Sequence, residues 1–172
     1  MSETIDVLVA INAQDLIANT QNPSQDHNNP TPVSDPKSYI YMTVRHKNEV
    51  NGSSGAELNV SAKRQDTIRW RETTYSVDSF YSVLFYRYVP GDPSKKLIET
   101  PQSKRPTADL PYPDPQAGDE AAFKTQKDVI APHWSAEVLN KGSDSYTFFF
   151  QVIDQDGKVV GYFSWDPFLT IS

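Results

Sequence analysis

The chain has 172 residues, of which 37% are hydrophobic and 12% aromatic, and these fractions suffice for one domain with a sizeable core. Its formal net charge of −6 at pH 7 argues against a nucleic-acid-binding protein, whose affinity comes from neutralising phosphates, and against a polybasic membrane anchor. The chain contains no cysteine, which excludes disulfides, thiolate metal sites and cysteine nucleophiles.

The N-terminal part predicts two strands separated by a helical turn and a polar loop. From residue 4 to 11, Ile and Val occupy every second position, which is typical of a strand with one buried face. Residues 12–19 predict a short helical turn. Residues 21–36 contain four prolines and predict an irregular loop, because proline cannot donate to a strand ladder. Residues 39–45 resume a strand pattern.

The middle of the chain predicts further strands and a second long loop. Short strands are expected at 57–62 and 66–72. Residues 80–89 are apolar on both faces, so we expect a long strand that is central in its sheet or covered by a partner. Residues 90–115 contain seven prolines and predict an irregular region. Residues 119–127 are ambiguous between a strand edge and a short helix.

The C-terminal part predicts strands joined by tight turns, at residues 134–139, 146–154, 158–165 and 168–171. The Asp-Gly pair at 156–157 is flanked by aromatic and β-branched runs, which is the strongest short-range signal for a β-hairpin. A two-residue turn there places Ile153 opposite Val160. The same register places Gln151 opposite Tyr162.

Many short strands, few helical periods and frequent turn residues indicate an all-β fold. We expect a single-domain antiparallel β-sandwich that spans residues 1–172 and has long Pro-rich loops. The N-terminus is acidic and lacks the features of a signal peptide, and no apolar run approaches the length of a membrane span. We therefore expect a soluble, cytoplasmic protein, with leaderless export as the alternative.

Short motifs that together point to a known family are spread from end to end, at residues 5–11 (IDVLVAI), 29–36 (NPTPVSDP), 39–42 (YIYM), 55–59 (GAELN), 66–73 (DTIRWRET) and 161–168 (GYFSWDPF). In this order they resemble the bacterial PixA/AidA inclusion-body protein family. The resemblance implies an abundant protein, often regulated by quorum or growth phase. Some members collect in intracellular inclusions, and some are linked to interactions of bacteria with invertebrate hosts.

The resemblance supplies no catalytic residue, and the residues themselves show no catalytic motif. His27, His46 and His133 are far apart in sequence, and no nucleophile elbow, P-loop or dinucleotide fingerprint is present. The acidic residues near Gly157 lack the ligand spacing of a calcium loop and are better explained by a tight turn. We therefore predict a protein that is not an enzyme and has no cofactor or metal site. The chain also has only two methionines, Met1 and Met42, unlike the methionine-rich members of the PixA/AidA family.

Arg69 and Arg71 flank Trp70 and form the first candidate ligand site. If Trp70 and Ile68 are buried, strand alternation places both arginines on the opposite face. There they would form an ion-pair surface with Glu72 or Asp78. Alternatively, they would bind a polar ligand, because arginine forks suit carboxylates and phosphates.

Trp134, Tyr162 and Trp165 form the second candidate site. Their rings would stack on the apolar faces of a sugar, with Asp166 or nearby groups such as Asn140 and Asp35 binding its hydroxyls. The alternative for these aromatic residues is packing in the core.

The function predicted from the sequence is non-enzymatic self-association into a homo-oligomer, extending to intracellular inclusions. An apolar face at residues 80–88 is the candidate for a symmetric dimer contact. Lys95, Lys96, Lys104 and Arg105 make the second loop locally positive, either as a solvated loop or as a contact for an acidic surface on another copy. The alternative function is a lectin-like module that binds a carbohydrate or another small molecule. An enzyme, with a histidine and carboxylates meeting in a pocket, is a third class.

Overall fold

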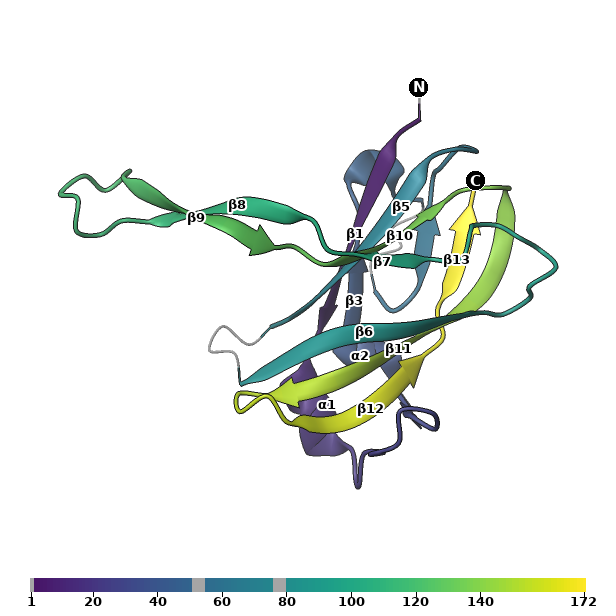
Figure 1. Cartoon of the computed structure of the whole chain (residues 1–172). Coiled ribbons are helices and arrows are strands. Elements are labelled where there is room, and N and C mark those ends of the chain that lie inside the picture. Colours follow the sequence, from purple (N-terminus) through teal and green to yellow (C-terminus); the bar gives the residue numbers. More distant parts are fainter. Residues whose placement is uncertain (1, 51–54, 76–79) are drawn as a thin grey trace.

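The computed structural model describes residues 2–50, 55–75 and 80–172 and has an all-β architecture, as predicted (Figure 1). One sheet has the strand order β3 (Ile40–Thr43), β1 (Thr4–Ile11), β5 (Thr67–Thr74), β10 (His133–Glu137) and β7 (Gln102–Lys104). The second sheet has the order β2 (Thr31–Pro32), β12 (Val159–Trp165), β11 (Gly142–Asp154), β13 (Phe168–Ile171) and β4 (Leu58–Val60), with β6 (Tyr81–Pro90) also paired to β11. Strands β8 (Thr107–Pro113) and β9 (Phe123–Ile130) form a separate hairpin. The helical elements are α1 (Ala13–Asn19), α2 (Pro36–Tyr39) and a 3-10 turn at His46–Asn48.

The sheets are mixed, so the prediction of a purely antiparallel sandwich is wrong in this respect. Strands β1 and β5 are parallel neighbours, as are β12 and β2, and β13 and β4. Parallel pairing requires a crossover connection, and the long segment from β1 to β5 provides one through α1, α2 and β3. In this register Val7 lies beside Trp70, and Asp6 lies beside Arg69.

The core lies between the two sheets and is largely aromatic. Alternate residues of β1 are at most 1% exposed, as its sequence pattern predicts. From the same sheet, Trp70 meets the rings of Tyr146 and Phe148 on β11, with ring centroids 6.3 and 5.8 Å apart. These aromatic contacts join the two sheets and hold them at a fixed separation.

Helix α1 forms where the sequence predicts a helical turn. Asn12 is its N-cap, and the Asn12 side-chain oxygen accepts a hydrogen bond from the Asp15 backbone N–H at 3.2 Å. Leu16 is buried and anchors the helix on the core.

The predicted hairpin around residues 156–157 is confirmed, but its turn is one residue longer than the two-residue turn expected, and one of the two predicted pairings is wrong. Gly157 has φ +78, and the Asp154 carboxylate accepts hydrogen bonds from the backbone N–H groups of Asp156 and Lys158. Gln151 pairs with Tyr162, as predicted. Ile153 pairs with Val159 instead of Val160, because the Asp154 N–H donates to the Lys158 carbonyl at 2.9 Å and residues 155–157 form the turn. The register shift between residues 152 and 153 then restores the predicted pairing of Gln151.

Replacing Gly157 with valine is expected to lower the free energy of unfolding by about 1–2 kcal/mol. A β-branched side chain is strained at φ +78, although nothing lies within 4 Å of the position that its Cβ would occupy. Urea titration of both proteins measures the difference. Because a Cβ at this position would meet no neighbouring atom, the loss should come from backbone strain alone. Gly157→Asn should show a much smaller loss, since asparagine tolerates positive φ better.

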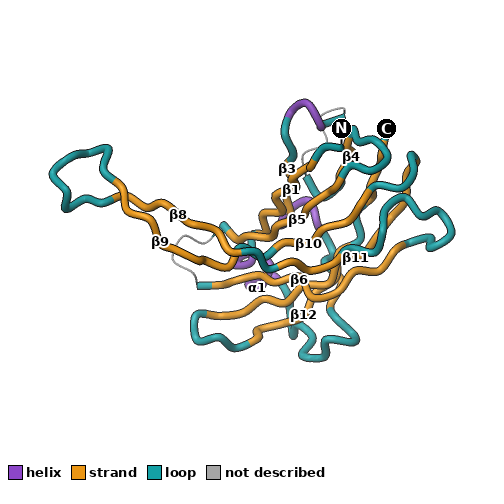
Figure 2. The backbone as a smooth tube through the Cα atoms, turned by 45° about the horizontal axis from the view of Figure 1, so that its top comes forward, coloured by secondary structure: helices purple, strands orange, loops and turns teal. Residues whose placement is uncertain are grey.

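The second proline-rich region contains strands, so the sequence-based expectation of an irregular loop holds for only part of it. It contains β7 and β8, and the ambiguous segment at 119–127 contributes to β9. We call the β8–β9 hairpin the arm. It extends well away from both sheets (Figure 1 and Figure 2). Pro111 and Pro113 are accommodated because a two-stranded ladder leaves one edge of each strand unpaired.

Strand β6 lies at an edge among the described residues, so the expectation that it is central within its sheet is wrong. It pairs with β11 alone. On its other side, the Phe85 N–H donates to Glu72 at 3.2 Å, and the Thr74 hydroxyl donates to the Tyr81 carbonyl at 3.1 Å. Its outer face leaves Leu84 38% exposed. Coverage of this face by a partner remains a prediction.

Candidate functional site

Arg69 and Arg71 project from the outer face of the first sheet, as strand alternation predicts. Ile68 and Trp70, which alternate with them on β5, are fully buried. The parallel register sets Asp6 beside Arg69 and Leu8 beside Arg71. Both arginines therefore share one face with side chains from β1.

Arg69 is held by Asp6, a partner that the sequence alone did not suggest. Its Nε donates to Asp6 Oδ1 at 2.6 Å, and its Nη2 lies 2.6 Å from the same oxygen. Of the two partners expected from the sequence, Glu72 turns toward the interior, and Asp78 lies outside the described residues. Because the pair is partly exposed, its net contribution to stability is about 1 kcal/mol or less. Its main effect is to orient the Arg69 guanidinium.

A cavity of about 400 Å³ opens beside these arginines, at the base of the arm. Its lining residues come from three sources: β1 and β5, the start of β10, and the two chain segments that enter and leave the arm. They are Asp6, Val7, Leu8, Arg69, Arg71, Pro106, Ala131, Pro132 and His133. The Ala131 N–H donates to the Pro106 carbonyl at 2.8 Å, which closes the base of the arm.

Basic residues form a row across this face. The antiparallel register pairs Trp134 with Trp70 and His133 with Lys104. Extending the first register by one residue sets His133 beside Arg71. Arg71, His133 and Lys104 thus follow one another across β5, β10 and β7, and none of them forms an ion pair within the described residues. We call these three residues the basic row.

Glu72 lies on the opposite, inward-facing side of β5. Burial raises the pKa of its carboxyl above the ordinary 4.5, although hydrogen bonds from the backbone of Glu72 and Phe85 and the charge of Arg71 oppose the shift. One oxygen accepts the Phe85 N–H, and the other has no hydrogen-bond partner. The folded protein therefore holds the Glu72 proton to higher pH than the unfolded chain does.

This shift gives stability a pH dependence with a definite sign. Its contribution is fully present below the unfolded pKa and is lost as pH rises through the folded pKa. Glu72→Gln should remove that loss, because the amide oxygen still accepts the Phe85 N–H. Relative to the variant, the wild type should thus lose stability as pH rises from about 4.5 toward the neutral range. Urea titrations across this range measure the slope. The exposed Glu99→Gln variant should keep the wild-type slope.

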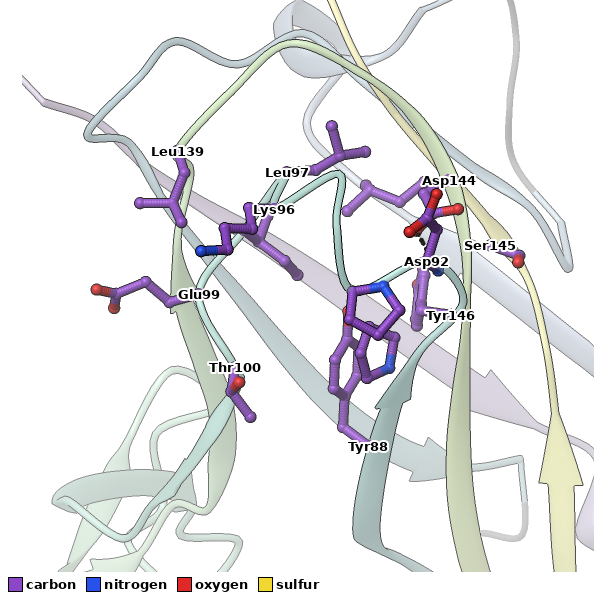
Figure 3. A pocket seen from close by; sticks show the side chains of 14 residues that line it. Tyr88, Asp92, Lys96, Leu97, Glu99, Thr100, Leu139, Asp144, Ser145 and Tyr146 are labelled. Carbon is purple, nitrogen blue, oxygen red and sulfur yellow. Dashed lines mark hydrogen bonds between the residues drawn. The ribbon is translucent and has the colours of Figure 1, made fainter.

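A second cavity, of about 300 Å³, lies where the loop after β6 meets β11 (Figure 3). Tyr88 lies along one wall, where burial raises its pKa to about 12 and the nearby charge of Asp144 adds to the shift. The Asp144 carboxylate accepts the Asp92 N–H at 2.9 Å and lies 3.2 Å from the ammonium of Lys95. The Asp144 carboxylate therefore holds the loop in place.

The structure separates the aromatic residues of the predicted sugar site. Trp165 is only 1% exposed, and its indole N–H donates to the Ala56 carbonyl at 3.0 Å, so it packs in the core. Trp134 is half-buried and meets the core ring of Phe148 edge-on at 5.9 Å. Tyr162 lies on the outer face of the second sheet, and Asp166 is exposed beyond the end of β12. These residues do not line one common cavity.

Tyr162 instead belongs to an aromatic cluster that the sequence analysis missed. Its ring lies 5.7 Å from Tyr86 and 6.0 Å from His27, and Tyr86 in turn lies 6.1 Å from Phe149. The Arg87 guanidinium lies 3.8 Å above the Phe149 ring. Tyr86 and Arg87 reach the same face because the register shift between residues 149 and 150 leaves one extra residue in β6. That bulge has no local sequence signal.

The three histidines lie in separate places. His27 belongs to the aromatic cluster, His46 is exposed in the 3-10 turn, and His133 lines the cavity at the arm. Within residues 2–50, 55–75 and 80–172, no three histidine or acidic side chains gather closely enough to hold a metal ion. In the same ranges, no helix is both long and apolar enough to cross a membrane.

The structure is an all-β protein with two packed mixed sheets, a projecting hairpin and a surface cavity lined by arginines at the base of that hairpin. The chain belongs to the PixA inclusion body protein family, whose model matches residues 3–171. It is similar to the crystal structure of an inclusion body protein of this family from Burkholderia cenocepacia J2315, with a TM-score of 0.78 and 18% sequence identity. The similarity covers 99% of this chain and 97% of that one and shows a shared fold. No curated protein matches the chain.

Proposed function

We propose that this protein is a non-enzymatic bacterial protein that associates with copies of itself, and that the arm carries the main contact. The observation behind the proposal is the arm's exposure. No residue of β8 or β9 is buried. A lone two-stranded hairpin is marginally stable in water and normally needs a partner surface. A second copy of the chain would supply that surface.

The apolar side chains of the arm lie on both of its faces. Phe123, 67% exposed, pairs with Pro113 on one face, whereas Tyr112 pairs with Lys124 on the other. Leu110, 44% exposed, shares the second face with Tyr112. Apolar area exposed on both faces favours packing against a protein surface. Association repeated through further contacts would concentrate the protein in intracellular inclusions.

Analytical ultracentrifugation tests the proposal. The wild type should be oligomeric at micromolar concentration, and Leu110→Ser combined with Phe123→Ser should raise its dissociation constant at least about tenfold. Phe168→Ser is the matched control, because Phe168 is 55% exposed but lies on β13, outside the arm. A wild type that stays monomeric at high concentration and low salt would overturn the proposal.

The outer face of β6 is the competing contact surface. Leu84 and Val89 are 38% and 41% exposed there. If Leu84→Ser dissociates the oligomer and the arm variant does not, self-association stands but belongs to β6.

Carbohydrate binding is a second candidate function, supported by the aromatic cluster around Tyr162. Its tyrosine and phenylalanine rings are half-buried at the surface and His27 is exposed, and aromatic faces there suit the apolar face of a sugar. A glycan array with the wild type and Tyr162→Ala tests this. Binding that the variant loses would support a lectin, and the absence of binding to any glycan would count against one.

A further inference from the structure

The arm carries opposite charges at its two ends. At its tip, Asp119 and Glu120 are exposed and form no ion pair within the described residues, whereas Asp114 is paired with Lys124 at 3.0 Å. At its base lies the basic row beside the 400 Å³ cavity. Between these ends, Asp109 and Lys127 neutralise each other. Near the base, Asp128 on β9 also forms no ion pair within the described residues, but Arg71, Lys104 and Arg105 outnumber it there. The net unpaired charge is therefore acidic at the tip and basic at the base.

The cavity at the base is suited to a carboxylate. Arg69 is fixed by Asp6, so its orientation is set before any ligand arrives. Arg71 has neither a hydrogen bond nor an ion pair among the described residues, and its guanidinium lines the same cavity. A guanidinium with free donors binds a carboxylate in a bidentate fashion. Lys104, which pairs with His133 across β10 and β7, extends the positive surface away from it.

We propose that two copies of the chain exchange their arms in antiparallel fashion, so that the acidic tip of each enters the basic cavity at the base of the other's arm. In this arrangement Asp119 and Glu120 of one copy face Arg71 and Lys104 of its partner. The inference rests on the proposed self-association and specifies its partner and orientation.

The antiparallel arrangement accounts for the apolar and the charged features of the arm together. Arms that pack face to face cover the face of each copy that carries Leu110 and Tyr112, while both tips reach a base. The contact is self-complementary and closes as a two-fold dimer. Because the whole chain carries a charge of −6, two copies repel each other at long range. Local complementarity at the arms then selects this orientation over others.

A charge-swap experiment tests the inference. The tip variant carries Asp119→Asn and Glu120→Lys, and the base variant carries Arg71→Glu and Lys104→Glu. Each variant alone should show at least about a tenfold weaker dimer, because like charges then meet at both contacts. An equimolar mixture should regain a 1:1 heterodimer, because both of its tip–base contacts are again complementary. Sedimentation velocity with one variant fluorescently labelled measures the pairing.

A matched control separates local from global charge. Gln155→Lys with Asp156→Lys changes the net charge by the same amount as the tip variant, but on the exposed β11–β12 turn. It should dimerise at least as well as the wild type. Higher salt should weaken the wild-type dimer. At each salt concentration, the control should still dimerise at least as well as the wild type.

The outcomes separate the inference from the proposed function. If the wild type never self-associates, the proposed function fails, and the inference fails with it. If the wild type dimerises but the two charge variants dimerise equally well, self-association stands and the tip–base contact is refuted. If the mixture forms open chains larger than dimers, the reciprocal exchange is refuted. Circular dichroism of each variant confirms that it is folded.

Discussion

Phe148→Ala is expected to lower the free energy of unfolding by about 3–5 kcal/mol, the largest effect of any single substitution considered for this protein. Phe148 is fully buried at the centre of the aromatic core. Its ring contacts rings from both sheets, namely Trp70, Phe85, Tyr88, Trp134, Tyr146 and Trp165. These large neighbours cannot collapse into the space without breaking their mutual contacts. The alanine variant would therefore keep most of the cavity.

The adjacent residue provides the control for this prediction. Phe149 points to the outer face, where it is half-buried under the Arg87 guanidinium. Phe149→Ala removes the same atoms but should cost only about 1 kcal/mol, since it loses a surface cation–π contact and leaves no enclosed cavity. Guanidinium titration followed by tryptophan fluorescence measures both values. Equal losses in the two variants would contradict the assigned faces of β11.

Gly91→Ala is expected to destabilise the protein by about 2–3 kcal/mol through overpacking. An alanine Cβ at this position would lie 2.5 Å from the backbone carbonyl oxygen of Ser145. The Gly91 N–H donates to that same carbonyl at 2.9 Å, so the two strands cannot separate without losing this hydrogen bond. The variant should also loosen the loop that closes the cavity beside Tyr88.

Gly118→Ala separates this effect from the general cost of replacing glycine. Gly118 has φ +72, but a Cβ there meets nothing within 4 Å. Its replacement should cost about 1 kcal/mol from backbone strain. Thermal unfolding of both variants gives the comparison. A smaller loss at Gly91 than at Gly118 would contradict the close approach of β6 and β11.

Local sequence patterns predicted the features that depend on neighbouring residues alone. The two-residue period in β1 and β5 identified their buried faces, including the opposite directions of Trp70 and Arg71. The Asp-Gly pair identified the β11–β12 turn because Gly157 supplies the positive φ. These features are specified within a few residues, so one sequence is enough to find them.

Local patterns predicted an irregular region where the first strand of the arm lies, because prolines normally interrupt sheets. Pro111 and Pro113 argue for a loop in a central strand but are acceptable in a two-stranded hairpin. The same limitation affected the candidate ligand residues. Tyr162 and Trp165 lie three residues apart in one strand, so alternation places them on opposite faces, but only their places in the sheet decide which of them is a core ring and which a surface ring.

The sequence by itself determined the all-β class, the hairpin turn and the faces of individual strands, because alternation and turn chemistry act between adjacent residues. Only the tertiary structure decided the parallel pairing of β1 with β5, the partnership of Arg69 with Asp6 and the projection of the arm. Those features depend on segments far apart in the chain. Their contact is chosen by the packing of the whole core, which no local pattern encodes.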